Sequence, residues 1–275
     1  MSIISKNNTN HKVVKMNEIE KRKVVEHNDL ISSVAKMDKT PLKIFELAVS
    51  CIDTENPPKD NIIYLSKKEL FRFFKVSDND KHSRFKHAIE VMQKQAYFNI
   101  RQNKELGIEY ESIVPIPTVK WNSYNDDVFI RFNPDIMPYL IDLKNNFTQY
   151  ALSDVMELNS KYSIILYKWL SMNFNQYEHY SHKGGRRKEQ LEEYANPSIK
   201  ISELRQLTDT VNEYKKFPDF RKKTIDIPIE EINRHTHFMV TYEKIKKGRS
   251  IDSIQFHIAK KEQPIELNGE YKERE

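Results

Sequence analysis

Glycine and cysteine are both scarce in this chain. Its 275 residues include 5 Gly and 1 Cys, whereas glycine averages about 7% of residues in proteins. The sequence contains neither GxGxxG nor GxxxxGK[ST], so it offers little material for a loop that binds nucleotide phosphates. We therefore expect no nucleotide-driven enzyme. The single cysteine, Cys51, cannot form an internal disulfide, which is typical of a reducing compartment.

Long apolar runs are missing as well. No stretch approaches the ~20 apolar residues that span a bilayer, and the N-terminus has no apolar segment of a secretory signal after its charges. We expect a cytoplasmic protein that contacts no membrane. Charged residues make up 31% and aromatic residues 11% of the chain, which is typical of a folded protein with a well-solvated surface. The length is compatible with two domains.

The positive charge is unevenly distributed. The chain has 45 Lys and Arg against 40 Asp and Glu, a net charge of +5. Residues 1–25 hold six cations and two acids, net +4, residues 26–212 sum to −1, and residues 262–275 to −3. Residues 213–261 hold twelve cations and seven acids, net +5. A charge cluster is often only a solvated face, so its place in the fold has to decide its role.

The first half has the pattern of a helix-turn-helix followed by a β-hairpin. Ser66-Lys67-Lys68-Glu69 has the form of a capping box, and a polar turn at 77–80 separates two helical patterns. The predicted helices occupy 28–35, 40–53, 67–74, 81–96 and a stretch that begins between Pro134 and Pro138. The predicted strands occupy 62–65, 112–121 and 128–132, and the last two form the hairpin.

The second half repeats this order. The best helical pattern of the chain covers 160–177 and predicts a core helix, whereas the polar stretch 177–197 predicts an exposed, mobile loop. Ser202 is predicted to cap a short helix that ends at Thr208-Asp209, and a second helix starts around Pro218. Alternating apolar residues then predict a hairpin with Lys246-Lys247-Gly248-Arg249 at its tip.

Two such units predict an α+β fold with two tandem winged-helix domains that form a pseudo-repeat. A winged helix is a helix-turn-helix followed by a β-hairpin, which is called the wing. We assign residues 1–26 to a flexible basic leader, 27–145 to an N-terminal domain, 146–261 to a C-terminal domain and 262–275 to an acidic tail.

The basic segment 213–261 covers the second helix and the wing of the second unit, and the second helix of a helix-turn-helix enters the major groove of DNA. Helical geometry directs Phe217, Phe220 and Thr224 inward, which makes the opposite residue, Lys222, the leading candidate for a base-edge contact. Asp219 is a candidate acceptor for cytosine N4, and the alternative is that its charge serves only to stabilise the N-terminus of the helix. The candidates for phosphate contacts are Lys215, Lys216, Arg221, Lys223, Lys246, Lys247 and Arg249.

An ordered series of segments also carries a family resemblance. The segments are 147–150 (FTQY), 162–167 (YSIILY), 217–223 (FPDFRKK), 231–233 (EIN), 242–249 (YEKIKKGR) and 254–256 (IQF). From about residue 27 to 260 the chain resembles the iteron-binding plasmid replication initiators, which have tandem winged-helix domains. The resemblance implies binding to repeated double-stranded sites at a plasmid origin, opening of an adjacent AT-rich segment, and recruitment of the host initiator and replicative helicase. It also implies a homodimer, formed through the N-terminal domain, that represses its own promoter and is in equilibrium with an origin-binding monomer. The resemblance further implies an auxiliary DNA contact from the N-terminal domain, for which Lys81 and Arg84 are the candidates.

Other functions remain open at this point. A winged-helix transcription regulator would use the same DNA contacts without a role in replication. A metal-dependent nicking enzyme needs a His-hydrophobic-His strand and a nucleophilic Tyr, and His235-Thr236-His237 comes closest, although threonine holds the middle position. The pair His179 and His182 lies in a polar stretch. A partner-binding module whose basic hairpin is only solvated would leave the repeated plan unexplained. We therefore expect a protein that is not an enzyme and needs no metal or other cofactor.

Overall fold

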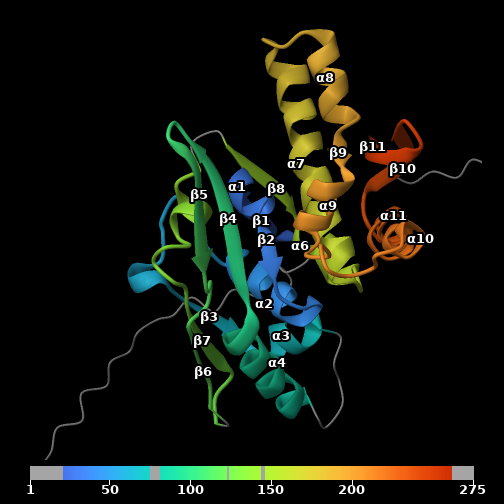
Figure 1. Cartoon of the computed structure of the whole chain (residues 1–275). Helices are drawn as coiled ribbons and strands as arrows, with labels where there is room; N and C mark the ends of the chain where they lie inside the picture. Colours follow the sequence, from blue (N-terminus) through green and yellow to red (C-terminus); the bar gives the residue numbers. More distant parts are fainter. Residues whose placement is uncertain (1–20, 75–80, 123, 144–145, 262–275) are drawn as a thin grey trace, which may run out of the picture.

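The computed structural model describes residues 21–74, 81–122, 124–143 and 146–261 (Figure 1). The predicted turn at 77–80, most of the leader and the acidic tail lie outside these residues. In chain order the first unit has β1 (Lys23–His27), α1 (Asn28–Ile31), β2 (Val34–Lys36), α2 (Lys39–Val49), the short turn η2 (Lys59–Asn61), β3 (Ile62–Ser66), α3 (Lys67–Phe73), α4 (Lys81–Gln95), β4 (Tyr97–Lys104), β5 (Gly107–Ile113), β6 (Thr118–Lys120), β7 (Asp127–Arg131), α5 (Pro138–Ile141) and β8 (Phe147–Ala151).

The start of α3 forms as predicted. The Ser66 hydroxyl accepts hydrogen bonds from the backbone N–H groups of Lys68 and Glu69, at 3.1 and 3.3 Å, and the Glu69 carboxylate accepts one from the Ser66 N–H at 3.4 Å. This capping box satisfies N–H groups that the first helical turn leaves without partners. It ends β3 and fixes the start of the helix-turn-helix formed by α3 and α4.

The hairpin of the first unit differs from the prediction. β4 pairs with β5 directly after α4, and β2 pairs with the other edge of β4. The predicted hairpin at 112–121 and 128–132 is therefore wrong as the wing, because only its inner part pairs, as β6 with β7, beside β3. The predicted helix over 28–35 is also too long: α1 ends at Ile31, and Ala35 lies in β2.

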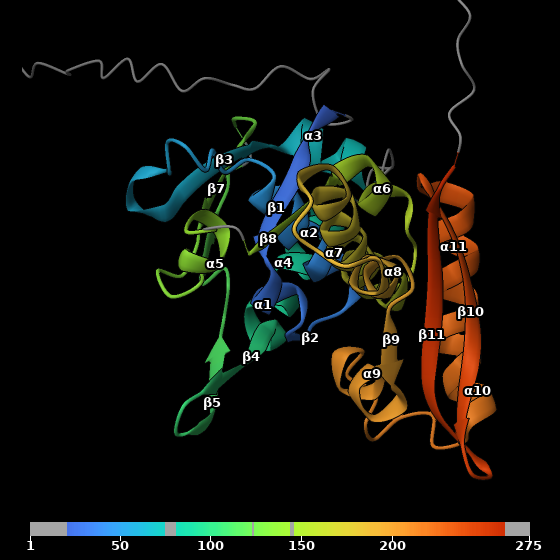
Figure 2. The same cartoon turned by 90° about the horizontal axis from the view of Figure 1, so that it is seen from above.

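The second unit follows with α6 (Leu152–Glu157), α7 (Lys161–Lys183), α8 (Lys188–Ala195), β9 (Ser198–Lys200), α9 (Ile201–Leu207), α10 (Phe217–Arg221), the π-helical turn η3 (Lys222–Asp226), α11 (Ile227–His235), β10 (Phe238–Lys247) and β11 (Ser250–Lys260). Because α10, η3 and α11 are continuous, they form one helix, which we call helix 217–235. β10 pairs with β11 and β11 with β9, all antiparallel (Figure 2). A short helix, a break, a second helix and a hairpin thus follow in the predicted order.

Two predictions for this unit are wrong. The stretch 177–197 is not a loop: α7 continues to Lys183, a turn at Gly184 and Gly185 with φ of 74° and 83° reverses the chain, and α8 returns against α7. Few side chains are buried there, so the sequence lacks the apolar stripe that marks a helix. Ser202 is not the cap of α9, because that helix already begins at Ile201.

α7 joins the two units. The ring of Tyr167 lies 5.9 Å from that of Tyr150 in β8 and 5.8 Å from that of Phe238 in β10, measured between centroids, and Leu166 and Leu170 are fully buried. β8 pairs with β1 across the predicted domain boundary between residues 145 and 146, and that boundary stays a prediction.

Within the ranges given above, no helix is both long and apolar enough to cross a membrane.

Candidate nucleic-acid interface

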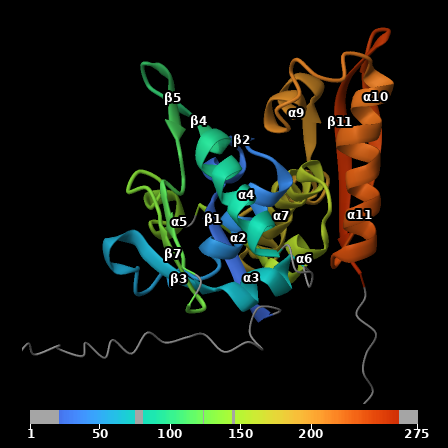
Figure 3. The same ribbon diagram turned by 90° about the horizontal axis from the view of Figure 1, so that it is seen from below.

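Helix 217–235 covers one face of its sheet and lies at the outside of the unit (Figure 3). Phe220, Thr224 and Ile225 are fully buried, whereas Lys222 and Lys223 are exposed. The outward direction of Lys222 agrees with the prediction from helical geometry. The π-helical turn has a local cause. Pro228 has no backbone N–H and its ring crowds the carbonyl four residues earlier, so the helix widens just before it.

The π-helical turn brings together Arg221 and Asp226, which are five residues apart. Arg221 Nε lies 3.0 Å from Asp226 Oδ2, and the Tyr242 hydroxyl in β10 donates to Asp226 Oδ1 at 2.6 Å. Burial raises the pKa of Tyr242 to about 12, together with its hydrogen bond to Asp226 and the charge of that carboxylate. The phenol therefore stays a donor at neutral pH, and Asp226 ties the helix to the wing. Ordinary helical spacing does not predict this contact, because residues five positions apart do not face each other on an α-helix.

The wing projects beyond the packed part of its sheet. Every residue from Glu243 to Ser250 is exposed, including Lys246, Lys247 and Arg249. The strands join through a tight turn in which Gly248 has a φ of 64°, a backbone conformation that favours glycine. α10 and the wing tip lie at the same end of the unit in Figures 2 and 3. The structure thus brings the cationic tip to the end at which helix 217–235 begins.

The connection before α10 presents further predicted residues. Lys215, Lys216 and Asp219 are all exposed. Arg205 holds the connection: its guanidinium donates to the backbone carbonyls of Thr210, Glu213 and Tyr214, at 2.9 to 3.0 Å, and lies 4.1 Å from the centroid of the Phe220 ring. No spacing in the sequence signals this role. The DNA contacts assigned to the second unit stay predictions, and the structure places their side chains on one end of it.

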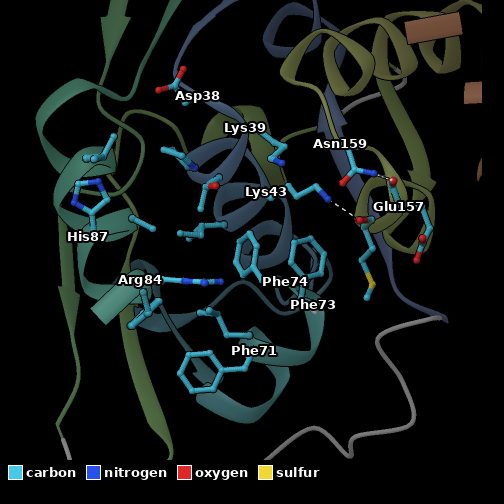
Figure 4. A pocket seen from close by; sticks show the side chains of 18 residues that line it. Asp38, Lys39, Lys43, Phe71, Phe73, Phe74, Arg84, His87, Glu157 and Asn159 are labelled. Atoms are coloured by element: carbon cyan, nitrogen blue, oxygen red, sulfur yellow. Dashed lines mark hydrogen bonds between the residues drawn. The ribbon is translucent and has the colours of Figure 1, made fainter. Parts of the chain in front are cut away.

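The first-unit candidates lie apart from this cluster. Lys81 begins α4, but its side chain lies outside the described residues. Arg84 is directed from α4 toward Phe73 and Phe74 in a cavity of about 660 Å³ between α2, α3, α4 and the C-terminal end of α6 (Figure 4). The auxiliary DNA contact assigned to Arg84 stays a prediction.

The histidines considered for a metal site have other neighbours. His237 Nδ1 lies 2.7 Å from Asp154 Oδ2 in α6, and Thr236 is buried with its hydroxyl donating to the carbonyl of Ile232 at 2.9 Å. His182 Nδ1 lies 2.8 Å from the Glu178 carbonyl within α7. In the part of the chain that the structure describes, no group of three or more His, Cys, Asp or Glu side chains is arranged to hold a metal ion.

Comparison with known families decides which family this chain belongs to. Residues 23–171 match the family described as Initiator Replication protein, WH1, and residues 200–258 match Initiator Rep protein, WH2. The first match alone covers more than half of the chain. The chain belongs to this initiator replication protein family. The family resemblance and the predicted fold class, two tandem winged-helix domains, are confirmed.

Relatives of this initiator extend the comparison. It is 21% identical to the PI protein of Escherichia coli over 266 residues, which is 88% of this chain and 84% of that protein. It is 24% identical to a replication initiation protein of Escherichia coli over 143 residues, 50% of this chain and 40% of that protein. The crystal structure of Pi initiator protein in complex with iteron DNA matches with a TM-score of 0.68 and 20% identity, covering 89% of this chain and 99% of that chain. At this identity the structural match shows a shared fold.

Proposed function

We propose that this protein initiates plasmid replication by sequence-specific binding to repeated double-stranded sites, or iterons, at the origin. One observation carries the proposal: the exposed lysines in the first half of helix 217–235, Lys222 and Lys223, lie toward the same end of the second unit as the exposed cations of the wing tip. Membership of the initiator family supports it. So does the likeness to a Pi initiator whose structure contains iteron DNA.

The proposal gives the cations separate roles. Lys222 faces away from the core and would reach a base edge in the major groove, since lysine donates to guanine O6 and N7. Lys215, Lys216 and Lys223 on the helix side, and Lys246, Lys247 and Arg249 on the wing, would neutralise phosphates, which gives affinity without direct sequence reading. Arg221 is already paired with Asp226, so its guanidinium would contact a phosphate while it keeps this ion pair.

The remaining parts of the proposal concern state and partners. The protein would act in the cytoplasm without catalysis of its own, and binding energy would drive opening of the origin. It would exchange between a monomer on iterons and a homodimer on its own promoter, and would recruit the host initiator and helicase. Sedimentation over a concentration series, with and without operator DNA, tests the exchange: one species throughout would contradict it.

Footprinting on the DNA that flanks its own gene tests the central claim. Protection of regularly spaced repeats is the expected result. Protection of a single inverted repeat would instead assign the protein as a transcription regulator. Cleavage of single-stranded origin DNA that needs a metal and disappears when one tyrosine is changed would assign it as a nicking enzyme.

A further inference from the structure

Most of the α7–α8 hairpin lies outside the two family matches. Those matches end at residue 171 and resume at residue 200, and the distal half of α7, the glycine turn and α8 lie between them. Figure 1 shows the hairpin rising from the body of the molecule, with its turn far from the elements that form the proposed DNA interface. We call residues 183–188 the basic tip.

The basic tip carries one sign of charge. Residues 179–188 contain Lys183, Arg186, Arg187 and Lys188 and no Asp or Glu, and all four cations are exposed. Lys188 has only a distant, exposed pairing with Glu192 at 3.7 Å, and such pairs contribute little. Among the described residues, neither Lys183 nor Arg187 lies within ion-pair distance of an acid. The tip therefore holds cations whose charge is not neutralised within the molecule.

The tip is held in place by an aromatic stack. The Arg186 guanidinium lies 4.2 Å from the centroid of the Tyr180 ring and donates to its hydroxyl at 3.1 Å. Tyr180 in α7 stacks on Tyr194 in α8, with 6.1 Å between centroids and 18° between planes. This packing joins the two helices and fixes one cation of the tip before any partner binds, which lowers the entropy lost on binding.

The chemistry of the tip favours a phosphate backbone over a protein surface. Interfaces between proteins depend on aromatic or other apolar anchors that become fully buried, and residues 181–190 contain no apolar side chain. Contacts to DNA phosphates need only cations, and arginine presents a fork that fits two phosphate oxygens. A DNA duplex is therefore the partner that matches the exposed cations of the tip.

The direction of the hairpin suggests which phosphates it reaches. In Figure 1 helix 217–235 is seen end on, whereas α7 and α8 lie along the plane of view, so the hairpin runs across the direction of that helix. A duplex held by a helix in its major groove also extends to either side of that helix. We propose that the basic tip binds phosphates of the same duplex in the DNA that flanks the segment covered by helix 217–235 and the wing. This inference rests on the proposed DNA-binding function.

The test compares two duplexes and two double variants. One duplex contains only the footprinted site, and the other adds about 20 base pairs on each side, roughly two helical turns. Lys183→Gln with Arg187→Gln removes two tip cations that have no acidic partner. Lys59→Gln with Lys120→Gln is the matched control, because it removes two exposed lysines beside the β3–β7–β6 sheet. Affinity is measured over a series of salt concentrations with the full-length protein.

The tip variant should bind the short duplex with the same affinity and the same salt dependence as the wild type. On the long duplex its slope of log affinity against log salt should be smaller by about two units, one per lost phosphate contact, and the control variant should not change. Equal binding of wild type and tip variant to the long duplex would overturn the inference, as would equal losses on both duplexes. The inference would also be overturned if the tip bound a different DNA molecule. In that case a second, separately labelled duplex would stay bound to the wild-type complex and would be lost from the complex of the tip variant. If the wild type binds neither duplex specifically, the proposed function itself fails.

Discussion

Lys168 Nζ lies 2.6 Å from Oε1 of Glu46, and both side chains are buried. The same ammonium lies 2.8 Å from Oε2 of Glu26, and the Tyr150 hydroxyl donates to the second oxygen of Glu46 at 2.5 Å. Lys168 comes from α7, whereas the two carboxylates come from α2 and β1. Two acids thus share one lysine where the first unit packs against the helix that leads into the second.

Replacing Lys168 by Met should destabilise the protein strongly. The change keeps much of the side-chain volume but leaves two buried carboxylates without a counter-charge, and breaking a buried ion pair from one side costs about 3–5 kcal/mol. Urea unfolding measures the loss. Lys183→Met, at the exposed end of the same helix, is the control and should change the free energy of unfolding by less than about 0.5 kcal/mol. Similar losses in the two variants would contradict the assigned role of Lys168.

Glu26 should make stability depend on pH near neutrality. Burial raises its pKa from 4.5 to about 7, with a further contribution from the charge of Glu46 and an opposing one from Lys168. The folded state therefore binds this proton more tightly than the unfolded chain. The stabilisation is complete below pH 4.5 and is lost as the pH rises through about 7. Between pH 5 and 8 the melting temperature of Glu26→Gln should accordingly fall less than that of the wild type, and parallel curves would refute this.

Some of this structure follows from local sequence and some does not. The capping box at Ser66 and the inward direction of Phe220 and Thr224 could be predicted, because each depends on residues only three or four positions apart in the sequence. The contact between Arg221 and Asp226 needs a π-helical turn, which ordinary helical spacing does not include. Partners such as Lys168 and Glu46, 122 positions apart, meet only through tertiary packing.

The missed secondary structure has similar causes. The wing of the first unit begins at Tyr97, two residues after α4 ends, so no turn signal separates the helical pattern from the strand. In β4 the buried residues Phe98 and Ile100 alternate with less buried ones over a short stretch only. α8 contributes no fully buried side chain, and its helical form depends on packing along α7 rather than on an apolar stripe of its own.

Lys222→Ala should reduce sequence discrimination. If Lys222 contacts a base edge, the variant loses roughly 1–3 kcal/mol on the cognate site and much less on random duplex. Binding of both DNAs at one salt concentration measures the difference. Equal losses on the two DNAs would mean that Lys222 contacts a phosphate rather than a base. Lys223→Ala is the control, because Lys223 is adjacent, is also exposed and is predicted to contact a phosphate.

Changing Lys246 and Lys247 together to Ala should weaken binding to all sequences. The two lysines lie in the exposed wing tip, and each phosphate that they neutralise releases counterions when the complex forms. The slope of log affinity against log salt should therefore fall by about two units on cognate and random duplex alike. An unchanged slope would remove the wing from the interface.

Asp226→Asn should strengthen random binding and weaken discrimination. The carboxylate now pairs with Arg221 and accepts from Tyr242, so its loss frees a cation for phosphates and loosens the tie between helix and wing. On random duplex the salt slope should grow by about one unit, while the ratio of cognate to random affinity falls because the helix is held less firmly against the sheet. Glu230→Gln, an exposed acid on the same helix, changes the net charge equally without releasing an arginine. If both variants shift the slope and the ratio alike, net charge alone accounts for the effect and the Arg221–Asp226–Tyr242 contact has no role in positioning the helix.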